Sequence, residues 1–466
     1  MKTELLSPAG SLKGMKHAFA YGADAVYAGQ PRYSLRVRNN EFSTLDALKE
    51  GIDEAHRLDK KFYLAANIAP HNAKVKTFLR DIQPVIELNP DALIMSDPGL
   101  IMMVREHFPD MPVHLSVQAN VVNYAGVKFW HRQGIERVIL SRELSLDEVE
   151  EIRMQCPEME LEVFVHGALC IAYSGRCLLS GYFNKRDPNQ GTCTNACRWK
   201  YQLHDAQETE TGDIIASDAA VQQHAEESAV TQVDPAAFLP AQPDTFNPHV
   251  DGLEEQTFLL QEASRPGEYM PIYEDEHGTY IMNSRDLRAV QHVERLVKMG
   301  VHSLKIEGRT KSPYYVARTA QAYRKAIDDA EAGRNFDMGL MDELESLASR
   351  GYTEGFYRRH VHDQYQNYDR GNSLGEKQQL VGDVVSLDQG KLKIDVKNKF
   401  AVGDKLELVK PSGNVSFDLT EMINKKGEAM DYAPGSGHVV DIPAPEGLDN
   451  SDQQLEEFGM LVRYLK

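Results

Sequence analysis

The feature that most constrains the fold is a repeated alternation of short apolar segments and helix-like segments along residues 4–308. The stretches between the apolar segments carry helical signals, such as Ser145 with Glu148 three residues later, which is typical of a helix N-terminus. The short segments are rich in β-branched and other apolar residues, as buried parallel strands are. They are residues 4–9, 25–29, 61–67, 92–97, 113–118, 137–143, 161–167 and 303–308. Eight strands alternating with helices predict an α/β fold of the (β/α)8 TIM-barrel type, with a doubly wound open sheet as the alternative.

The chain is expected to hold an insertion and a second domain besides the barrel. The stretch between the seventh and eighth strands is far longer than one crossover helix needs, so we expect an insertion at about 168–290. Within it, residues 205–265 contain 13 Asp and Glu but only one basic residue, Arg265, which predicts a flexible acidic segment. From residue 376, apolar and polar residues alternate between turn residues, as in an antiparallel β-barrel. The predicted domains are a catalytic barrel over 1–375 and a small β-barrel over 376–466.

Composition and charge narrow the class of protein. The chain has no run of about 18 apolar residues, which argues against a membrane span. Its first residues, MKTELLSPAGS, lack the apolar centre of a signal peptide, so a cytoplasmic location is expected. The net charge of −19 does not favour a nucleic-acid partner, although it does not exclude local basic sites. Such sites are Arg32, Arg36, Arg38, Lys185, Arg186, Arg198 and Lys200.

Charged side chains gather at the carboxyl ends of the predicted strands, which is where barrel enzymes build their sites. Charged groups on otherwise apolar strands are costly to bury without partners. We therefore interpret them as a site for a small anion, and leave the single serines at other strand ends as helix caps or loop contacts. The predicted catalytic residues are Arg142, Glu143, His166, Lys305, Glu307 and Arg309.

Four of the five cysteines follow the seventh strand closely, at Cys170, Cys177, Cys193 and Cys197. In a reducing compartment such a group indicates metal ligands or reactive thiols rather than disulfides. The spacing C-x6-C-x15-C-x3-C does not fit the close pairs of a structural zinc site. A catalytic thiol paired with His166 would leave three cysteines unexplained. An iron–sulfur cluster tolerates irregular spacing, but spacing alone leaves the cluster, zinc and free thiols open.

The segment EVFVHGALCIAYSGRCLLS, at 162–180, resembles the signature of a family historically filed as collagenase-like peptidases of unknown catalytic type. The resemblance covers nearly the whole chain and includes ELLSPAG, GADAVYAG, IEGRTKS and the small C-terminal barrel. PRYSLRVRNNEF, NIAPHNAK, LSVQAN and NKRDPNQGTCTNACRW are most similar to a branch of that family that modifies tRNA.

That resemblance implies an RNA-modifying enzyme rather than a peptidase. It implies hydroxylation of carbon 5 of the wobble uridine in certain tRNAs to 5-hydroxyuridine, linked to prephenate as co-substrate and independent of dioxygen. It also implies a 4Fe–4S cluster on four cysteines, which match Cys170, Cys177, Cys193 and Cys197. A peptidase, or a non-catalytic protein that delivers tRNA or prephenate to another enzyme, stays as the alternative.

Joined with the charged strand ends, the resemblance assigns expected roles to individual residues. Arg142, Lys305 and Arg309 would bind carboxylates of prephenate or phosphates of tRNA. Glu143, Glu307 and His166 would transfer protons or orient those cations. The basic residues named above would hold the anticodon stem, and Tyr33 or Trp199 could stack on an extruded base, with ordinary packing as the alternative for both.

Overall fold

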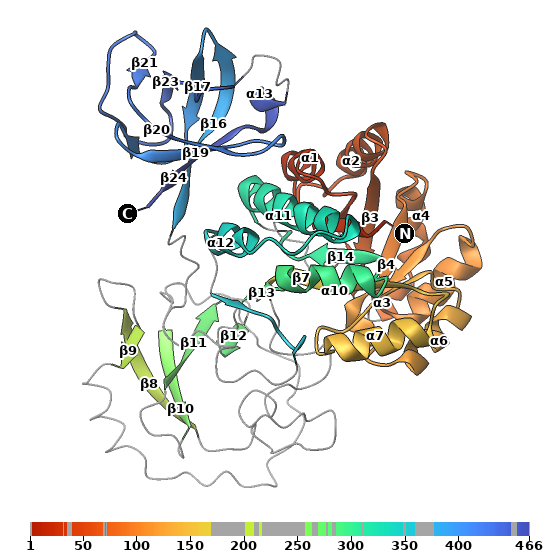
Figure 1. Cartoon of the computed structure of the whole chain (residues 1–466). Coiled ribbons are helices and arrows are strands. Elements are labelled where there is room, and N and C mark those ends of the chain that lie inside the picture. Colours follow the sequence, from red (N-terminus) through yellow and green to blue (C-terminus); the bar gives the residue numbers. More distant parts are fainter. Residues whose placement is uncertain are drawn as a thin grey trace. The chain divides into compact units, whose positions relative to one another are not determined.

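The structure is a computed structural model (Figure 1). It describes residues 2–30, 32–34, 40–68, 70, 72–168, 286–309, 311–347, 351–358, 377–448 and 454–465 in full, and the backbone alone of 201–208, 214–216, 257–262, 269–275 and 278–281. The predicted cluster cysteines therefore lie outside the described residues. None of the helices within the described ranges is both long and apolar enough to cross a membrane.

Eight parallel strands close into a barrel. They are β1 (Glu4–Pro8), β2 (Ala25–Gly29), β3 (Lys61–Ala66), β4 (Ala92–Met95), β5 (Val113–Leu115), β6 (Arg137–Ile139), β7 (Glu160–Ala168) and β14 (Ser303–Ile306). Each strand from β1 to β7 pairs with the next, and β14 pairs with both β1 and β7, which completes the ring. This closure confirms the predicted (β/α)8 barrel and rules out the open sheet.

Helices surround the ring of strands, as Figure 1 shows. They are α1 (Leu12–Ala20), α2 (Leu45–Arg57), α3 (Asn72–Val75), α4 (Phe78–Ile86), α5 (Pro98–His107), α6 (Tyr124–Arg132), α7 (Leu146–Gln155), α10 (Val293–Lys298), α11 (Pro313–Glu331) and α12 (Gly339–Glu345). Several begin where a side chain accepts a backbone N–H of the first turn, which stabilises a helix N-terminus. At α7 this is the predicted capping box of Ser145 and Glu148. Two short 3-10 helices, η1 (Val117–Ala119) and η4 (Val290–His292), complete the barrel domain.

The strand β7 changes partner along its length. It pairs with β6 and β14 first, and then its last residues pair antiparallel with β13 (Asp286–Arg288), which also pairs with β15 (Tyr352–Thr353). The register against β14 steps from Phe164 to His166, so Val165 is an extra residue, a β-bulge. A bulge re-aims the side chains that follow it. Accordingly, Glu162 lies inside the barrel beside Lys305, whereas His166 lies against Tyr323 of α11.

Residues Cys170–Arg285, together with Asp363–Ser373, form a separate compact unit. Its described part is an antiparallel sheet of β8 (Tyr201–Glu208), β9 (Ile214–Ala216), β10 (Thr257–Glu262), β11 (Tyr269–Asp275) and β12 (Gly278–Ile281). The segment 205–265, expected to be flexible, thus contributes strand residues at 205–208, 214–216 and 257–262. Its other residues lie outside the described part of the chain.

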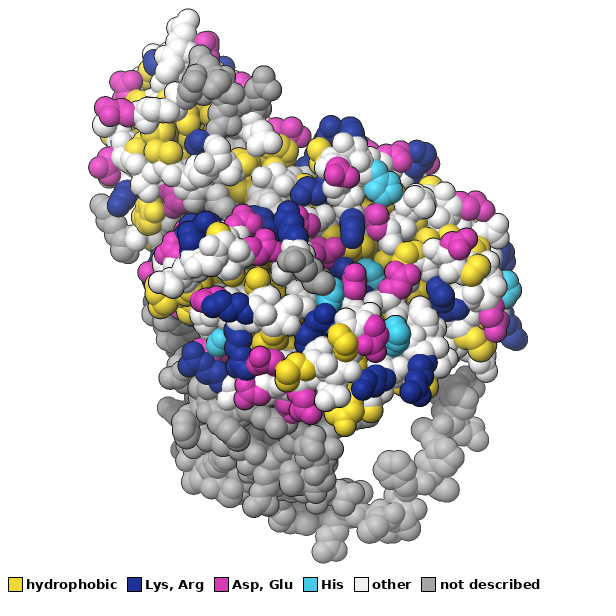
Figure 2. Space-filling view, turned by 45° about the vertical axis from the view of Figure 1, so that its right-hand side comes forward, with side chains coloured by type: hydrophobic (Ala, Val, Ile, Leu, Met, Phe, Trp, Pro, Cys, Tyr) yellow, Lys and Arg dark blue, Asp and Glu magenta, His cyan; other side chains and the backbone are white. Residues whose placement is uncertain are grey.

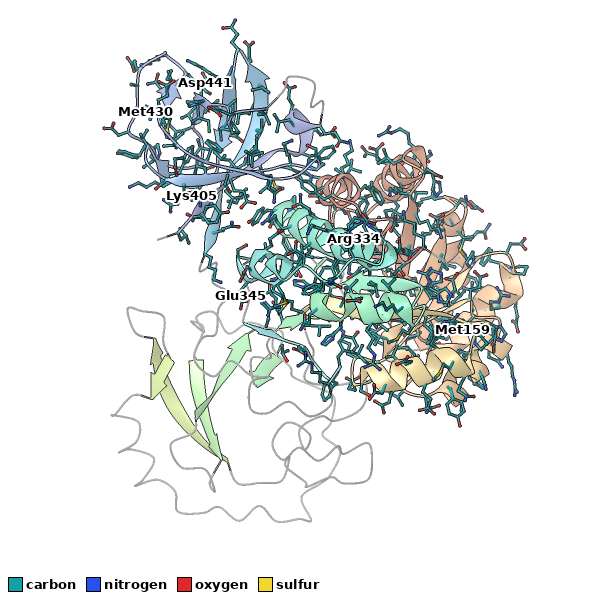
Figure 3. All side chains as sticks on the ribbon, viewed as in Figure 1. Met159, Arg334, Glu345, Lys405, Met430 and Asp441 are labelled. Atoms are coloured by element: carbon teal, nitrogen blue, oxygen red, sulfur yellow. The ribbon has the colours of Figure 1, made fainter. Side chains whose placement is uncertain are left out.

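The C-terminal domain is an antiparallel β domain, as predicted. Its larger sheet consists of β16 (Gln378–Asp388), β17 (Lys391–Val396), β19 (Lys405–Val409), β20 (Val415–Asp418), β21 (Ile423–Asn424), β23 (Val439–Pro443) and β24 (Met460–Tyr464). A second sheet pairs β18 (Phe400–Ala401) with β22 (Tyr432–Ala433), and α13 (Leu455–Phe458) precedes β24. Lys405 and Asp441, labelled in Figure 3, mark β19 and β23. The domain has its own core, which includes Val381, Leu392 and Leu461.

This domain is joined to the barrel through α1 and α11. Arg318 of α11 is buried, and its Nη1 lies 3.3 Å from Oε1 of Glu407 on β19. The hydroxyl of Tyr21, which follows α1, donates to the carbonyl oxygen of Phe458 at 2.9 Å. Since a buried charged pair needs both partners in place, these contacts fix the C-terminal domain against α11.

Candidate active site

A row of alternating charges fills the inside of the barrel, where most barrels of this kind hold branched apolar side chains. Near the amino ends of the strands, Nη1 of Arg137 lies 2.5 Å from Oε1 of Glu4 and 3.3 Å from Oε2 of Glu162. The other oxygen of Glu162 accepts a hydrogen bond from Nζ of Lys305 at 2.8 Å. Because Glu162 is fully buried, two cations share one carboxylate away from water.

The environment of this row changes the proton affinities of its members. Burial lowers the pKa of Lys305, and the neighbouring Glu162 carboxylate opposes that effect. Burial also opposes ionisation of Glu4, but the Arg137 guanidinium outweighs it and lowers the pKa of that carboxyl. Burial and the Arg137 charge together hold the pKa of His114 well below its usual range. The row therefore keeps the Glu4 carboxylate ionised and places the neutral His114 imidazole beside its cations.

Toward the carboxyl ends of the strands, the row continues through an aromatic ring. Nζ of Lys305 lies 4.3 Å from the ring centroid of Tyr27, a cation–π distance. The Tyr27 hydroxyl lies 3.2 Å from Oε2 of Glu307 and 3.1 Å from the carbonyl oxygen of Ile306. Tyr27 thus lies between the Lys305 ammonium and the Glu307 carboxylate. It contacts both groups and so connects the charges inside the barrel with those at the mouth.

Glu307 and Arg142 are the next pair of this row. Nη2 of Arg142 lies 3.8 Å from Oε2 of Glu307, beyond hydrogen-bond length. Nη1 of Arg142 donates to the carbonyl oxygen of Ala168 at 3.2 Å, and its guanidinium carbon lies 3.8 Å from the ring centroid of Phe164. The Phe164 ring and the end of β7 therefore hold the guanidinium in position.

The Glu307 backbone is held by β7 and α11. Its N–H donates to the His166 carbonyl oxygen at 2.8 Å, and its own carbonyl oxygen accepts from the Tyr315 hydroxyl at 3.0 Å. Gly167 has a φ of +100°, and a Cβ there would lie 2.4 Å from the Glu307 carbonyl oxygen. Only glycine at position 167 permits this close approach.

The other predicted mouth residues are held by local partners. Nη1 of Arg309 donates to the Ser34 hydroxyl at 3.0 Å, and Glu143 accepts a hydrogen bond from the Ser141 hydroxyl. The structure thus brings Arg142, Lys305 and Glu307 together through contacts with Phe164 and Tyr27. No ion pair or hydrogen bond links Glu143 to that group among the described side chains.

A second polar group stands at the ends of β3, β4 and β5. The Asn67 side-chain amide donates to Oε1 of Gln118 at 2.8 Å, and the Ser116 hydroxyl also donates to that oxygen. The Ser96 hydroxyl donates to the Asn67 carbonyl oxygen at 3.0 Å. These uncharged groups satisfy one another across three strands, so they add hydrogen-bonding groups to the mouth without adding charge.

His166 lies apart from the barrel-interior charges with which the sequence grouped it. The Tyr323 hydroxyl oxygen lies 2.7 Å from the Val165 carbonyl oxygen and 3.2 Å from Nδ1 of His166. Two oxygens at 2.7 Å need the hydroxyl proton between them, so Tyr323 donates to Val165 and accepts from His166. This assigns the imidazole proton to Nδ1 and leaves the lone pair on Nε2. The bulge at Val165 is the reason for the displacement, because it re-aims His166 toward α11.

Burial decides the protonation state of His166. It lowers the imidazole pKa to about 3, with smaller effects of the Arg288 and Lys311 charges. Its Nε2 atom is buried and has no hydrogen-bond partner in the described part of the chain. An imidazole with that pKa is neutral near pH 7, so it can accept a hydrogen bond there but is a weak base.

Of the residues predicted to hold the anticodon stem or to stack on a base, Arg32 and Tyr33 are described. Nη1 of Arg32 is 2.7 Å from Oδ2 of Asp81, and the Tyr33 hydroxyl donates to that same oxygen at 2.8 Å. Tyr33 is fully buried and meets the Phe78 ring edge to face, so it packs in the core rather than offering a face for stacking. On the face shown in Figure 2, Lys and Arg side chains are interspersed with Asp and Glu. The remaining RNA-binding candidates and the four cysteines Cys170, Cys177, Cys193 and Cys197 lie outside the described residues.

The inner part of the row, formed by Arg137, Glu162 and Glu4, was not predicted from the sequence. One signal was available, because Glu162 is a charged residue inside the apolar strand segment LEVFVHG. A buried strand that carries a charge predicts a buried partner. The identity of that partner depends on barrel closure, since Lys305 reaches Glu162 across the pairing of β14 with β7.

Two protein-family models together match most of the chain. The family model described as "Peptidase family U32" matches residues 10–367, which include the elements from α1 to β15. The chain belongs to peptidase family U32. A second model, the U32 C-terminal domain, matches residues 376–460.

Several relatives in the U32 family are named as acting on RNA. The chain is 64% identical to tRNA hydroxylation protein P of Escherichia coli K12, over 96% of this chain and 95% of that protein. It is 60% identical to the protein of the same name from Haemophilus influenzae, over 96% of this chain and 94% of that protein. A more distant relative, an E. coli 23S rRNA 5-hydroxycytidine synthase, is 27% identical over 92% of this chain and 55% of that protein.

Proposed function

We propose that this chain is an RNA-modifying enzyme that hydroxylates carbon 5 of the wobble uridine of tRNA to give 5-hydroxyuridine. The observation that supports this most strongly is the 64% identity, over 96% of the chain, to a protein named for tRNA hydroxylation. The likeness to a 5-hydroxycytidine synthase of rRNA supports hydroxylation of a pyrimidine ring as the common reaction.

In this proposal the charged row and the barrel mouth hold a small anionic co-substrate, prephenate. Arg142 offers a guanidinium that lies over the Phe164 ring, and Glu307 lies beside it. Lys305 contributes a positive charge further inside the barrel. Its ammonium group contacts the Tyr27 ring and donates a hydrogen bond to Glu162, which holds it in position. Glu307 is the mouth carboxylate that lies among these groups, because the Tyr27 hydroxyl and the Arg142 guanidinium both lie within 4 Å of its Oε2.

The four cysteines would hold the proposed 4Fe–4S cluster. Their donor set suits iron, since four thiolates complete the coordination of such a cluster. Cys170 follows the last residue of β7, Ala168, by two positions, so the first thiol is close in sequence to the end of β7. When bound, such a cluster supplies one-electron transfer.

A peptidase remains the second reading because of the family name. In the described part of the chain, the buried histidine near the mouth is held by Tyr323 rather than by a serine or cysteine. Nucleophilic hydrolysis needs a base within hydrogen-bond reach of the nucleophile. The geometry around His166 therefore gives the peptidase reading no support.

Reconstitution tests the proposal. Anaerobically purified protein is incubated with prephenate and unmodified tRNA, and the nucleosides are analysed by mass spectrometry. We expect 5-hydroxyuridine only when protein and prephenate are both present. Product that forms without prephenate would contradict the co-substrate, and no product with an iron-loaded protein would favour an accessory role.

A further inference from the structure

The Nε and Nη2 edge of the Arg142 guanidinium is the starting point for a further site. In arginine, Nε and Nη2 lie on the same edge, and together they can hold both oxygens of a carboxylate. Arg57 shows this arrangement within the same molecule, because its Nε and Nη2 donate to the two oxygens of Glu54 at 2.7 and 2.9 Å.

On Arg142 that edge has no acceptor at hydrogen-bond distance among the described residues. Its Nε is buried and unpaired, and its Nη2 has only the Glu307 oxygen at 3.8 Å. The rest of the group is fixed, since Nη1 donates to the Ala168 carbonyl oxygen and the plane lies over the Phe164 ring. A buried charged donor without an acceptor is unfavourable, so an incoming anion would be bound by a site already formed.

Arg142 differs from three other arginines whose Nε has no partner. Arg288, Arg318 and Arg324 also leave that atom unpaired, but their Nη1 atoms lie 2.9, 3.3 and 2.9 Å from a carboxylate oxygen. Their charges are therefore already compensated at close range. At the mouth, Lys305 donates to the Glu162 carboxylate, and Arg309 donates to the Ser34 hydroxyl.

We propose that the Nε and Nη2 edge of Arg142 binds a carboxylate group of a small organic acid through two parallel hydrogen bonds, next to Glu307. Both a carboxylate and a phosphate can accept two parallel hydrogen bonds from a guanidinium edge, and the proposed co-substrate supplies carboxylates. The ligand is small because the site is recessed, with 13% of the Arg142 side chain and 10% of the Glu307 side chain exposed. A phosphate of a folded RNA would need a more open edge.

This inference rests on the proposed function in one respect, namely that the carboxylate belongs to prephenate. It makes Arg142 the residue that contacts the co-substrate, and it makes Lys305 and Glu162 positioning residues beneath it. The tRNA would then be held by other groups, so carboxylate affinity and tRNA affinity should respond to different substitutions.

The test uses the full-length, iron-loaded protein and the substitution Arg142→Lys, which keeps the charge but removes the two-donor edge. Arg295→Lys is the control, because Arg295 is an exposed arginine on α10 that pairs with Asp147 and Glu150. Calorimetry gives the dissociation constants for prephenate, malonate and inorganic phosphate. Filter binding gives the tRNA affinity, and thermal unfolding shows that each variant is folded.

We expect Arg142→Lys to weaken prephenate binding by about 10- to 100-fold, the loss of one to two charge-assisted hydrogen bonds. Its tRNA affinity and unfolding temperature should stay near those of the Arg295→Lys control. Unchanged prephenate affinity, wild-type protein that binds neither prephenate nor malonate, or phosphate binding that depends on Arg142 more strongly than prephenate binding would each overturn the carboxylate site. If prephenate binds through Arg142 but no tRNA is hydroxylated, the site stands and the proposed function fails.

Discussion

Gly167 shows how one residue sets the geometry of the mouth. Its φ of +100° and the 2.4 Å that would separate a Cβ from the Glu307 carbonyl oxygen both oppose any side chain. We expect Gly167→Ala to lower the free energy of unfolding by about 2–4 kcal/mol, from backbone strain and the clash together. It should also displace Glu307 and reduce tRNA hydroxylation.

Gly333→Ala is the matched control for that substitution. Gly333 also has a positive φ, of +69°, but a Cβ there would meet no atom within 4 Å. Gly333→Ala should therefore lower the free energy of unfolding by about 1 kcal/mol, from backbone strain alone. Urea unfolding compares the two variants. An equal decrease in the free energy of unfolding would show that the contact with Glu307 does not contribute to stability.

His166 gives the protein a pH-dependent stability. Its pKa is about 3 in the folded protein, against 6.5 for a free imidazole, because burial disfavours the charged form. Between these values the unfolded chain binds more protons, so the contribution of His166 is fully present above pH 6.5 and is lost as pH falls toward 3. From pH 7 to pH 5 the loss should be about 2 kcal/mol.

The measurement is urea unfolding at pH 7 and pH 5. Between pH 7 and pH 5, the free energy of unfolding of His166→Gln should fall by about 2 kcal/mol less than that of the wild type. This difference does not depend on how stable the variant is at pH 7. The exposed His131→Gln variant serves as the control and should follow the wild type. A His166→Gln variant with the wild-type pH dependence would disprove the assignment of a buried, neutral imidazole.

At this scale the sequence predicted which mouth residues are charged, but not how they combine. Arg142, Lys305 and Glu307 were named from their places at strand ends, and the structure joins them through Phe164 and Tyr27. The position of His166 could not be foreseen, because a single extra residue in β7 reverses the direction of a side chain without a clear mark in the sequence.

At the scale of elements, α11 carries the strongest described link between barrel and C-terminal domain. Arg318 is buried against Glu407 of β19, which also accepts hydrogen bonds from Gln378 and Tyr464. Removing one partner of a buried charge pair leaves the other uncompensated. We expect Arg318→Met to lower the free energy of unfolding by about 3–5 kcal/mol.

A double-mutant cycle isolates that contact. Adding Glu407→Gln to Arg318→Met should recover part of the loss, because no unpaired carboxylate stays behind. Arg295→Met changes an exposed arginine that also forms ion pairs and should cost under about 1 kcal/mol. Additive losses for Arg318→Met and Glu407→Gln would mean that the pair does not couple the two domains.

The strand and helix elements of the barrel were the most predictable part of the molecule. Each of the eight predicted strands coincides with an observed one, because buried parallel strands have short apolar sequences with little ambiguity. The strands β13 and β15 were not predicted, since two or three residues carry no periodic signal and their pairing depends on the far end of β7.

At the scale of the whole molecule, the closed barrel does not depend on the cysteine segment. The pairs that close it, β1 with β14 and β14 with β7, use residues before Leu169 and after Arg285. We therefore expect replacement of Cys170, Cys177, Cys193 and Cys197 by serine to abolish iron binding and tRNA hydroxylation. The urea unfolding of the barrel should change by less than about 1 kcal/mol.

Cys156→Ser is the control for that variant. Cys156 ends α7, where it is buried beside the carbonyl oxygen of Tyr124, and it is not among the proposed ligands. It should keep its iron and its activity at a small cost in stability. Iron retained by the fourfold variant, measured by metal analysis and visible absorption, would refute the assignment of the cluster to these cysteines.

The register between β7 and β13 has a practical consequence. Ala168 and Asp286 stand opposite each other in that pairing, so the chain leaves the barrel and returns to it at neighbouring positions. A tight two-residue turn such as Asn-Gly can join antiparallel strands at such a point. The segment between them, residues 169–285, could thus be excised to give a minimal barrel for crystallisation, or exchanged between relatives to ask which RNA each one selects.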